Sequence, residues 1–438
     1  MIEHLPIEII TEILKKLPTN DLLSVSRVSK RFFELSTDPS LWKNFSIEYE
    51  TQEILKSKLK VPRFRKLKRL IWLKTEHERI KSNAEDLKTI LELLKPIDLQ
   101  ELHLFNLNLY KIDKELLSEV INKVETVIIG DYVNIDDDQI LRIMETIPKG
   151  NLKCLHVMNV NFGNIDLEIL ALAINSLESF EANFCHFEKD QIQALFLKMA
   201  NETKLKNLTF CPSDRKILED IPANILGSAF NNLQNLCLDR GDLTREQLFR
   251  IFEKMSVKTK LLKMFLPMTI PRLALPIPGN VLSKAINNLE VFIAPKSYFS
   301  QEQMKMILEE VAEPTSKLKE LDLRFSELLP ELSLDCLRAV MLKLTNNTFK
   351  FKIQLKVIQN FDETIKKIRQ ELEEKEADQA SMDQIKKKLR RLREVLFRQI
   401  TMHKNKIHEP LVMNSNLDQS LINCMLIGKS LSIIISED

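Results

Sequence analysis

The chain has few of the residues on which several protein classes depend. Its 438 residues include only seven glycines and four tyrosines, which disfavours an all-β sandwich or an enzyme that holds a nucleotide in glycine-rich loops. The sequence contains no G-x-x-x-x-G-K-[ST] or G-x-G-x-x-G motif, and no Ser-His-Asp order. We therefore expect a protein that is not an enzyme and needs no cofactor.

Metal sites, disulfides and membrane segments also lack a sequence signal. The six cysteines occur singly, without a C-x-x-C pair or a histidine at zinc-ligand spacing, at Cys154, Cys185, Cys211, Cys237, Cys336 and Cys424. We expect them to be reduced and mostly buried. Glu3 and Glu8 interrupt any signal-peptide pattern, and no stretch reaches the roughly 20 apolar residues of a spanning helix. A cytoplasmic or nuclear protein without membrane contact is expected.

The charge balance gives no general case for nucleic acid as a partner. The chain is 44% hydrophobic and 29% charged, with a net charge of +2, which favours a folded protein of two or three domains. One local exception runs from Lys56 to Lys74, where nine Lys or Arg residues occur without an acid. This segment is either a solvated linker and first-repeat surface, or a patch for acidic partners or nuclear import.

The first 45 residues predict three short, strongly apolar helices. Pro6 suits a first helical turn, and apolar residues recur on one face of the helix that follows. Pro18 ends this helix, Thr19 to Asp21 offer caps for a second, and Asp38-Pro39 starts a third. Together with Leu41, Trp42 and Phe45, the helices carry more apolar surface than they can bury among themselves. A partner is implied.

The order L-P, I-L-x-x-L, D-L-L, V-S-K-R-F and L-W resembles an F-box, the module that docks a substrate-recruiting protein onto a Skp-type adaptor of a cullin ubiquitin ligase. Ser29 and Phe32 depart from the Cys and Trp that the family often has there. The alternative is a small helical cap on the following domain. The resemblance implies that apolar side chains hold the adaptor, namely Leu5, Pro6, Ile9, Ile13, Leu14, Leu17, Leu22, Leu23, Val28, Leu41 and Trp42.

A repeat fills the middle of the chain. Segments of the L-x-x-L-x-L type, which predict strands, start at Leu67, Leu99, Val124, Leu152, Leu177, Leu205, Leu233, Leu261, Leu289 and Leu318. Between them apolar residues recur at helical spacing. The helices alternate between two types, and one type begins near the evenly spaced Gln191, Gln247 and Gln303, so the full pattern returns with every second repeat. Thr244 and Ser300 are predicted to open capping boxes.

This double repeat resembles the ribonuclease-inhibitor-like class of leucine-rich repeats. The resemblance implies an α/β fold, a curved solenoid with parallel strands inside and helices outside. Strands about 4.8 Å apart and helices about 10 Å across would bend it, so that the concave strand face is the natural binding surface. The Asn or Cys usual eight residues into the repeat occurs only as Cys185, which argues against an inward polar ladder.

Alternation predicts which side chains face outward from the strands. Their mixture of apolar, acidic and basic groups suits a protein substrate better than a phosphate backbone. His103 and His156 hold equivalent positions two repeats apart without a third ligand, so no metal is expected. The candidate substrate-binding residues are His103, Phe105, His156, Met158, Lys263, Phe265, Ile293, Asp322 and Arg324.

The predicted organisation is an F-box at 1–48, a basic linker at 49–66, leucine-rich repeats at 67–345 and a helical, coiled-coil-like region at 346–438. The last region either caps the solenoid or serves oligomerisation or a second partner. The whole chain is expected to be the substrate-recognition subunit of a Skp-cullin-F-box ubiquitin ligase, linked through the adaptor to a cullin scaffold. The alternative is a leucine-rich scaffold or inhibitor that does not lead to degradation.

Overall fold

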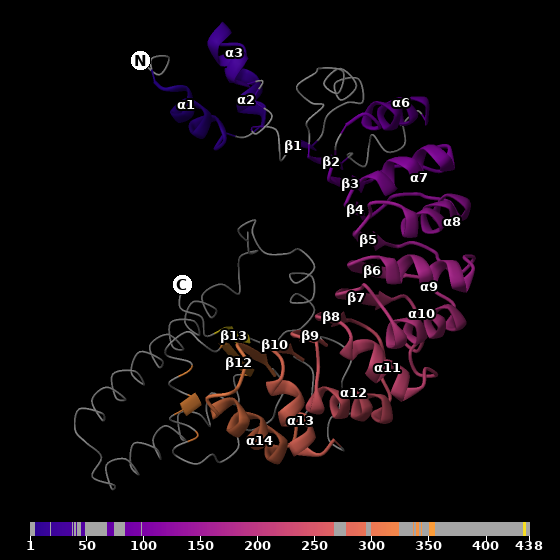
Figure 1. Ribbon diagram of the computed structural model, residues 1–438, viewed down its shortest axis with the longest axis vertical. Coiled ribbons are helices and arrows are strands. Elements are labelled where there is room, and N and C mark those ends of the chain that lie inside the picture. Colours follow the sequence, from indigo (N-terminus) through magenta and orange to yellow (C-terminus); the bar gives the residue numbers. More distant parts are fainter. Residues whose placement is uncertain are drawn as a thin grey trace, which may run out of the picture. The chain divides into compact units, whose positions relative to one another are not determined.

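The computed structural model describes 5–17, 19–36, 38, 41, 45–48, 68–73, 84–97, 99–266, 277–294, 299–323, 336, 339–340, 343, 350–354 and 432–434 (Figure 1). The chain divides into two compact units. Unit 1 comprises Met1–Lys198 and Glu202–Ser213, and unit 2 comprises Met199–Asn201 and Asp214–Asp438. The predicted basic linker lies outside the described residues.

The three predicted N-terminal helices are present. They are α1 Ile7–Leu14, α2 Thr19–Val25 and α3 Lys30–Ser36. Pro6 is the N-cap residue of α1, where its missing N–H costs no hydrogen bond. Both α1 and α2 contact α3, and the guanidinium of Arg31 donates to the carbonyl of Leu5 at 2.9 Å. Among the described side chains of this segment, the buried apolar ones are Ile10, Leu14 and Leu22.

Unit 1 contains parallel strands that follow one another in chain order. They are β1 Phe45–Glu48, β2 Arg69–Leu73, β3 Glu101–Phe105, β4 Thr126–Ile129, β5 Cys154–Met158, β6 Ser179–Cys185 and β7 Asn207–Pro212. Strands β2 to β7 each begin two residues after a predicted start. The prediction missed β1, because it counted Phe45 among the apolar residues of the F-box although Phe45 and Ile47 alternate with polar residues.

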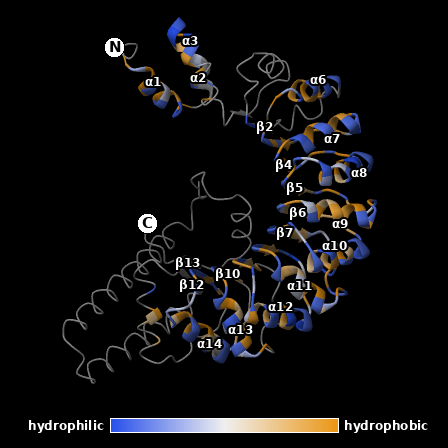
Figure 2. Ribbon diagram, viewed as in Figure 1, coloured by the Kyte–Doolittle hydropathy of each residue, from blue (hydrophilic) through white to orange (hydrophobic). Residues whose placement is uncertain are grey.

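Helices follow the strands and cover one face of them (Figure 1). In unit 1 they are α6 Ala84–Leu94, α7 Lys114–Lys123, α8 Asp137–Thr146 with the short 3-10 helix Ile147–Lys149, α9 Leu167–Ser176 and α10 Lys189–Asn201, whose last three residues belong to unit 2. Hydrophobic and hydrophilic residues alternate around these helices (Figure 2). Their apolar stripes are buried, as at Ile140, Ile143 and Met144 of α8. The predicted strand-and-helix repeat is therefore confirmed.

Unit 2 repeats the arrangement. Its parallel strands are β8 Asn235–Leu238, β9 Lys263–Phe265, β10 Val291–Ile293, β11 Glu320–Asp322 and β12 Lys350–Gln354. Its helices are α11 Ala223–Asn231, α12 Arg245–Val257, α13 Gly279–Asn287 and α14 Gln301–Ala312. A last strand, β13 Ser432–Ile434, pairs with β12 in antiparallel orientation.

The described parts of 346–438 are strands, although this region was predicted to be helical. Strand β12 extends the parallel sheet past residue 345. Its signal was present, because Phe351 and Ile353 alternate with Lys350, Lys352 and Gln354, which is the period of a strand. The predicted heptad-like seams lie outside the described residues.

A backbone interaction fixes the register at the N-terminal ends of the strands. The carbonyl of the residue just before a strand accepts two hydrogen bonds. The donors are the N–H group of the equivalent residue in the next repeat and the N–H group of the residue that follows it in the chain. Lys153 and Cys154, for example, both donate to the carbonyl of Glu125 at 2.9 Å. The same pairing recurs at the carbonyls of Lys68, Gln100, Lys153, Glu178, Gln234, Leu262 and Glu290. Each repeat therefore positions the entry of the next strand.

Buried glutamines explain why the pattern returns with every second repeat. Every second helix from α8 to α14 has a glutamine at its third position, buried below 5% exposure, at Gln139, Gln191, Gln247 and Gln303. The Gln247 side-chain oxygen accepts from Thr244 N at 2.8 Å, and its Nε2 donates to the carbonyls of Leu218 and Ile221 at 2.7 Å each. One side chain thus caps its own helix and ties down the loop of the preceding repeat. The predicted capping boxes at Thr244 and Ser300 are confirmed.

The intervening helices use asparagine near their C-termini. Asn232 and Asn288 hold equivalent positions two repeats apart, and they donate through Nδ2 to the carbonyls of Met199 and Met255 at 2.9 and 2.8 Å. These carbonyls belong to the last turns of α10 and α12, where backbone acceptors lack helical partners. The two helix types therefore differ in where the side chain that bonds to the preceding repeat lies. It is a glutamine at the N-terminus of one type and an asparagine at the C-terminus of the other.

We predict that Gln247→Leu strongly destabilises unit 2. The substitution leaves the Thr244 N–H and the carbonyls of Leu218 and Ile221 buried without their partner, and we expect a loss of about 3 kcal/mol in the free energy of unfolding. Urea denaturation followed by circular dichroism measures this loss. Gln234→Leu is the control, because Gln234 is exposed. Equal losses in the two variants would contradict the role of the buried amide.

Candidate functional site

The first candidate surface lies on the N-terminal helices. Ile9 and Ile13 are 49% and 44% exposed and lie one turn apart on α1, whereas Ile10 and Leu14 are buried. The prediction had placed all four on one face of the helix, and had counted Ile9, Ile13 and Leu14 among the adaptor-binding residues. The structure instead divides the apolar arc of α1 into a side that builds the small core and a side left in solvent.

The other predicted adaptor residues divide in the same way. Leu14 and Leu22 are buried, Leu5, Leu17 and Leu41 are half-buried, and Pro6, Ile9, Ile13 and Val28 are exposed. Trp42 and the side chain of Leu23 lie outside the described residues. The structure also exposes Ile7 and Phe33, which the prediction did not include although Ile7 follows Leu5-Pro6 directly. We call Ile7, Ile9, Ile13, Val28 and Phe33 the N-terminal apolar residues.

The second candidate surface is the side of strands β2 to β7 away from the helices, which we call the unit 1 face. Strand register places side chains from successive repeats in one row across this face, namely Ile71, His103, Ile128, His156, Glu181 and Thr209. The residues between them along each strand, such as Leu102 and Leu155, are buried against the helices. The predicted alternation is confirmed.

Apolar side chains occupy the middle of the unit 1 face. Phe105, Ile128 and Met158 are half-buried there. The ring of Phe105 crosses the neighbouring repeat, because a Cβ at Gly130 would lie 2.1 Å from its Cδ1. Glycine at position 130 therefore makes room for the aromatic ring on the next strand.

Polar contacts surround this apolar area. Arg69 Nε lies 3.0 Å from Glu101 Oε2, and Asn183 donates to Glu181 Oε1 at 2.6 Å. His156 Nδ1 lies 3.4 Å from Glu181 Oε2. These side chains hold one another in place on the face.

His103 is a neutral, buried histidine. Burial, with smaller contributions from the charges of Arg69 and His156, lowers the pKa of His103 to about 4. Its Nε2 lies 3.6 Å from Glu101 Oε2, but at neutral pH this contact is not an ion pair because the imidazole carries no charge. Its ring packs edge-on against Phe105 with centroids 6.5 Å apart. His103 therefore acts as a buried packing partner of Phe105 on this face.

Three predicted substrate-binding residues are less accessible than expected. His103 is buried beside Phe105, and Ile293 and Asp322 of unit 2 are buried as well. Alternation along a strand predicts the side on which a residue lies, but not what covers it. Phe105, His156, Met158 and Phe265 are half-buried and Lys263 is exposed, whereas Arg324 lies outside the described residues.

The described cysteines are free thiols. Cys185, Cys211 and Cys336 are buried, and Cys154 and Cys237 are half-buried; Cys424 lies outside the described residues. Burial raises the pKa of Cys185 to about 12, and its thiol donates to the carbonyl of Val157 at 3.7 Å. Leu107 and Val160, at the equivalent positions, are buried apolar residues. The described repeats around Cys185 thus have no inward polar ladder.

Within the described part of the chain, no three His, Cys, Asp or Glu side chains are grouped so as to hold a metal ion. A separate search of the described helices found none whose length and apolar character would let it cross a membrane.

Residues in the left-handed conformation lie at or just beyond the C-terminal ends of strands β3 to β6. Asn106, Tyr132, Asn159 and Phe184 have φ between 55° and 57°. Asparagine adopts this backbone conformation readily, whereas for residues with large side chains it costs about 1–2 kcal/mol of conformational free energy. Tyr132 and Phe184 are nonetheless 56% and 42% exposed. Sequence reasoning missed this feature, although an asparagine directly after β3 and after β5 was a usable signal.

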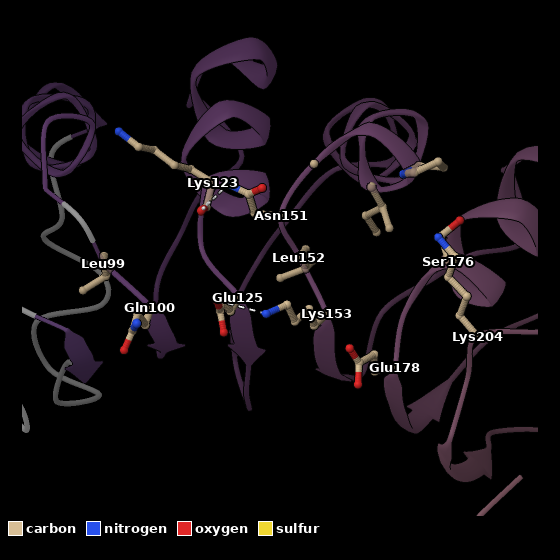
Figure 3. Close-up of a pocket in the computed structure, with 13 residues that line it drawn as sticks. Leu99, Gln100, Lys123, Glu125, Asn151, Leu152, Lys153, Ser176, Glu178 and Lys204 are labelled. Atoms are coloured by element: carbon tan, nitrogen blue, oxygen red, sulfur yellow. Dashed lines mark hydrogen bonds and ion pairs between the residues drawn. The ribbon is translucent and has the colours of Figure 1, made fainter.

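A shallow cavity of about 490 Å³ lies at the opposite, N-terminal edge of the same strands (Figure 3). Lys153 Nζ lies 3.0 Å from Glu125 Oε1 in its wall, and Lys123 donates to the carbonyl of Lys95. An equivalent pair, Lys206 and Glu178, bridges the next two repeats at 2.6 Å. These ion pairs connect consecutive repeats, so the residues that line the cavity serve the packing of one repeat on the next.

Comparisons with known proteins identify the N-terminal segment. Residues 2–48 match the family model described as F-box-like, which covers α1 to α3 and not the strand-and-helix repeats. No curated protein matches the chain. A solved structure described as the Rad7 and Elc1 complex in yeast contains a similar chain at 12% identity, over 74% of this chain and 85% of that one, with a TM-score of 0.33. A similarity this low transfers neither a fold nor a function.

We predict that unit 1 loses stability in mild acid through His103. An unfolded histidine binds a proton near pH 6.5, whereas folded His103 does so only near pH 4, so stability falls as the pH drops through this window. The loss from pH 7 to pH 4 is on the order of 3 kcal/mol. Tryptophan fluorescence measures it, because Trp42 and Trp72 both belong to unit 1.

His103→Gln should flatten this pH dependence. The relevant quantity is the change in unfolding free energy between the two pH values, so any constant destabilisation by the substitution cancels. His186→Gln, which replaces an exposed histidine of the same unit, is the control for removing an imidazole. An undiminished acid loss in His103→Gln would contradict a neutral buried imidazole.

We predict that Tyr132→Asn and Phe184→Asn each stabilise unit 1 by about 1 kcal/mol, because asparagine relieves the left-handed strain. Urea denaturation followed by tryptophan fluorescence measures the gain. Tyr110→Asn is the matched control, since Tyr110 is also exposed but has no positive φ. A similar gain in all three variants would show that removing a surface aromatic ring, and not the backbone, is responsible.

Proposed function

We propose that this protein is the substrate-recognition subunit of a Skp-cullin-F-box ubiquitin ligase. The observation that carries the proposal is the F-box-like match at residues 2–48, which coincides with the three helices that expose the N-terminal apolar residues. F-box domains bind Skp-type adaptors. In this proposal the adaptor covers Ile9 and Ile13, and through the adaptor the protein joins a cullin scaffold.

Burial of the N-terminal apolar residues would supply the binding energy. A large apolar side chain contributes roughly 1.5–3 kcal/mol when it is fully removed from water, and Ile9 and Ile13 retain about half of their surface for a partner. Leu14 and Leu22 contribute differently, because their burial among the helices holds the exposed residues in position. A preformed apolar surface reduces the ordering that binding requires.

The repeats would hold the substrate, in keeping with their resemblance to leucine-rich repeats of the ribonuclease-inhibitor-like class. The unit 1 face supports this role, because it combines half-buried apolar side chains with fixed polar ones and carries no helix among the described residues. Such a mixture is typical of protein-binding surfaces. The receptor would catalyse nothing itself, and would act in the cytoplasm or nucleus by holding a substrate near a ubiquitin-charged enzyme.

We predict that the full-length protein binds a purified Skp-type adaptor and that Ile9→Ser with Ile13→Ser weakens this binding at least about tenfold. Isothermal titration calorimetry measures the dissociation constants. Both residues are half-exposed in the free protein, so the substitutions spare the core formed by Ile10 and Leu14.

The control for this experiment is Leu172→Ser, which replaces a leucine of α9 that is 45% exposed and lies in the repeats. It should bind the adaptor as tightly as the unchanged protein. If the unchanged protein does not bind, or if the double variant binds equally well, the ligase proposal fails, and a scaffold that acts by occluding its partner becomes the better account.

A further inference from the structure

The unit 1 face continues into an unusual rim where the strands end. The strands are parallel, so the segments 106–115, 130–138, 159–168 and 184–190, which lead from β3 to β6 into the next helices, lie at the same edge. Together they contain ten carboxylates and three lysines. We call these four segments the unit 1 rim.

The rim is a preformed structure. Asn106 N donates to the carbonyl of Asp131 at 3.1 Å, and Leu109 N to that of Asn134 at 2.8 Å. The next two segments are joined in the same way, since Phe162 N donates to the carbonyl of His186 at 2.8 Å. A partner would therefore meet ordered loops, and little conformational entropy would be lost on binding.

Large side chains connect the rim with the apolar centre of the face. Four consecutive repeats each place one near the C-terminal end of its strand, namely Phe105, Tyr132, Met158 and Phe184. Tyr132 and Phe184 are exposed in the left-handed conformation, and Phe184 sits at the register shift in β6, where a bulge redirects a side chain. The result is an open sheet face with an aromatic edge among carboxylates.

Helix dipoles explain only part of the acidity. Carboxylates such as Asp113 and Asp166 cap helices α7 and α9, and negative charge is favourable at any helix N-terminus. Unit 2 has the same helix polarity, yet its corresponding segments 214–220 and 239–246 contain six carboxylates and four basic residues. Arg240 there takes the left-handed position that Tyr132 and Phe184 hold in unit 1. The difference lies in the balance of charge, because 130–138 and 159–168 of the unit 1 rim contain six carboxylates and no lysine or arginine, whereas each of these two unit 2 segments contains two basic residues.

We propose that the unit 1 face and rim bind an extended, basic segment of a partner protein, which under the proposed function is the substrate. Lysine or arginine side chains would lie against the rim carboxylates and the rings of Tyr132 and Phe184, where a cation is favoured both by charge and by the π face. Apolar side chains of the same segment would cover Phe105, Ile128 and Met158. A nucleic acid is disfavoured, because the rim would repel its phosphates.

A selection from a random 12-residue peptide phage library on the immobilised full-length protein tests the proposal. We expect the selected peptides to be enriched in Lys and Arg interspersed with apolar or aromatic residues. The best peptide, made synthetically, should bind at least about tenfold more weakly when the salt concentration is raised from 50 to 300 mM. A neutral or acidic peptide pool would overturn the proposal.

Variants locate the binding surface. Tyr132→Asn with Phe184→Asn removes both rings while keeping the backbone conformation that asparagine already adopts at Asn106 and Asn159, and should weaken the peptide at least tenfold. Glu168→Gln with Asp190→Asn, two exposed carboxylates that cap no helix, should weaken it several-fold. Arg240→Asn is the matched control in unit 2 and should have no effect. Equal peptide affinity in all variants would overturn the assignment to unit 1.

The same preparations separate this inference from the ligase proposal. Adaptor binding depends on Ile9 and Ile13, and peptide binding on Tyr132 and Phe184, so each can fail alone. Peptide binding without adaptor binding would support the proposed surface for a basic segment and contradict the ligase proposal. Adaptor binding together with a selected peptide pool that is not enriched in Lys and Arg would support the ligase proposal and contradict the surface for a basic segment.

Discussion

The loops between strand and helix carry backbone carbonyls into the interior, and every such carbonyl needs a donor. In the loops that lead into α7, α9, α11 and α13, Gln139, Gln191, Gln247 and Gln303 provide it, since each amide spans from its own helix N-terminus to the loop of the preceding repeat. A class with an inward asparagine ladder would solve this problem from the strand side. Here Leu107 and Val160 are apolar, and the helices supply the donors instead.

This arrangement leaves the other side of the strands available for binding. Because the loop carbonyls are satisfied from the helix layer, side chains on the open face can vary without loss of the fold. On the open face of unit 1, the ring of Phe105 lies over Gly130, and Asn183 is hydrogen-bonded to Glu181. The same unit has the aromatic residues Tyr132 and Phe184 in the left-handed conformation. The N-terminal helices meet a different constraint, because Ile10, Leu14 and Leu22 are buried there while Ile7, Ile9, Ile13, Val28 and Phe33 stay exposed.

Periodicity predicted the repeats well. Strands β2 to β11 each begin two residues after a predicted start, and the even spacing of Gln191, Gln247 and Gln303 has a physical cause in the buried amides. Exposure was harder to predict, because alternation assigns His103 and Asp322 to a side of the sheet without revealing what lies over them. The left-handed rim was missed for a related reason: Tyr132 and Phe184 lack the sequence preference that normally marks such a turn.

The alternation of helix types also restricts how such a chain can change in length. Removing a single repeat would join two helices of the same type, so that either a loop would lose its glutamine donor or a helix C-terminus would lose its asparagine donor. Removing or duplicating two adjacent repeats together restores every partner. The buried side chains therefore favour growth or shrinkage of such a chain by pairs of repeats.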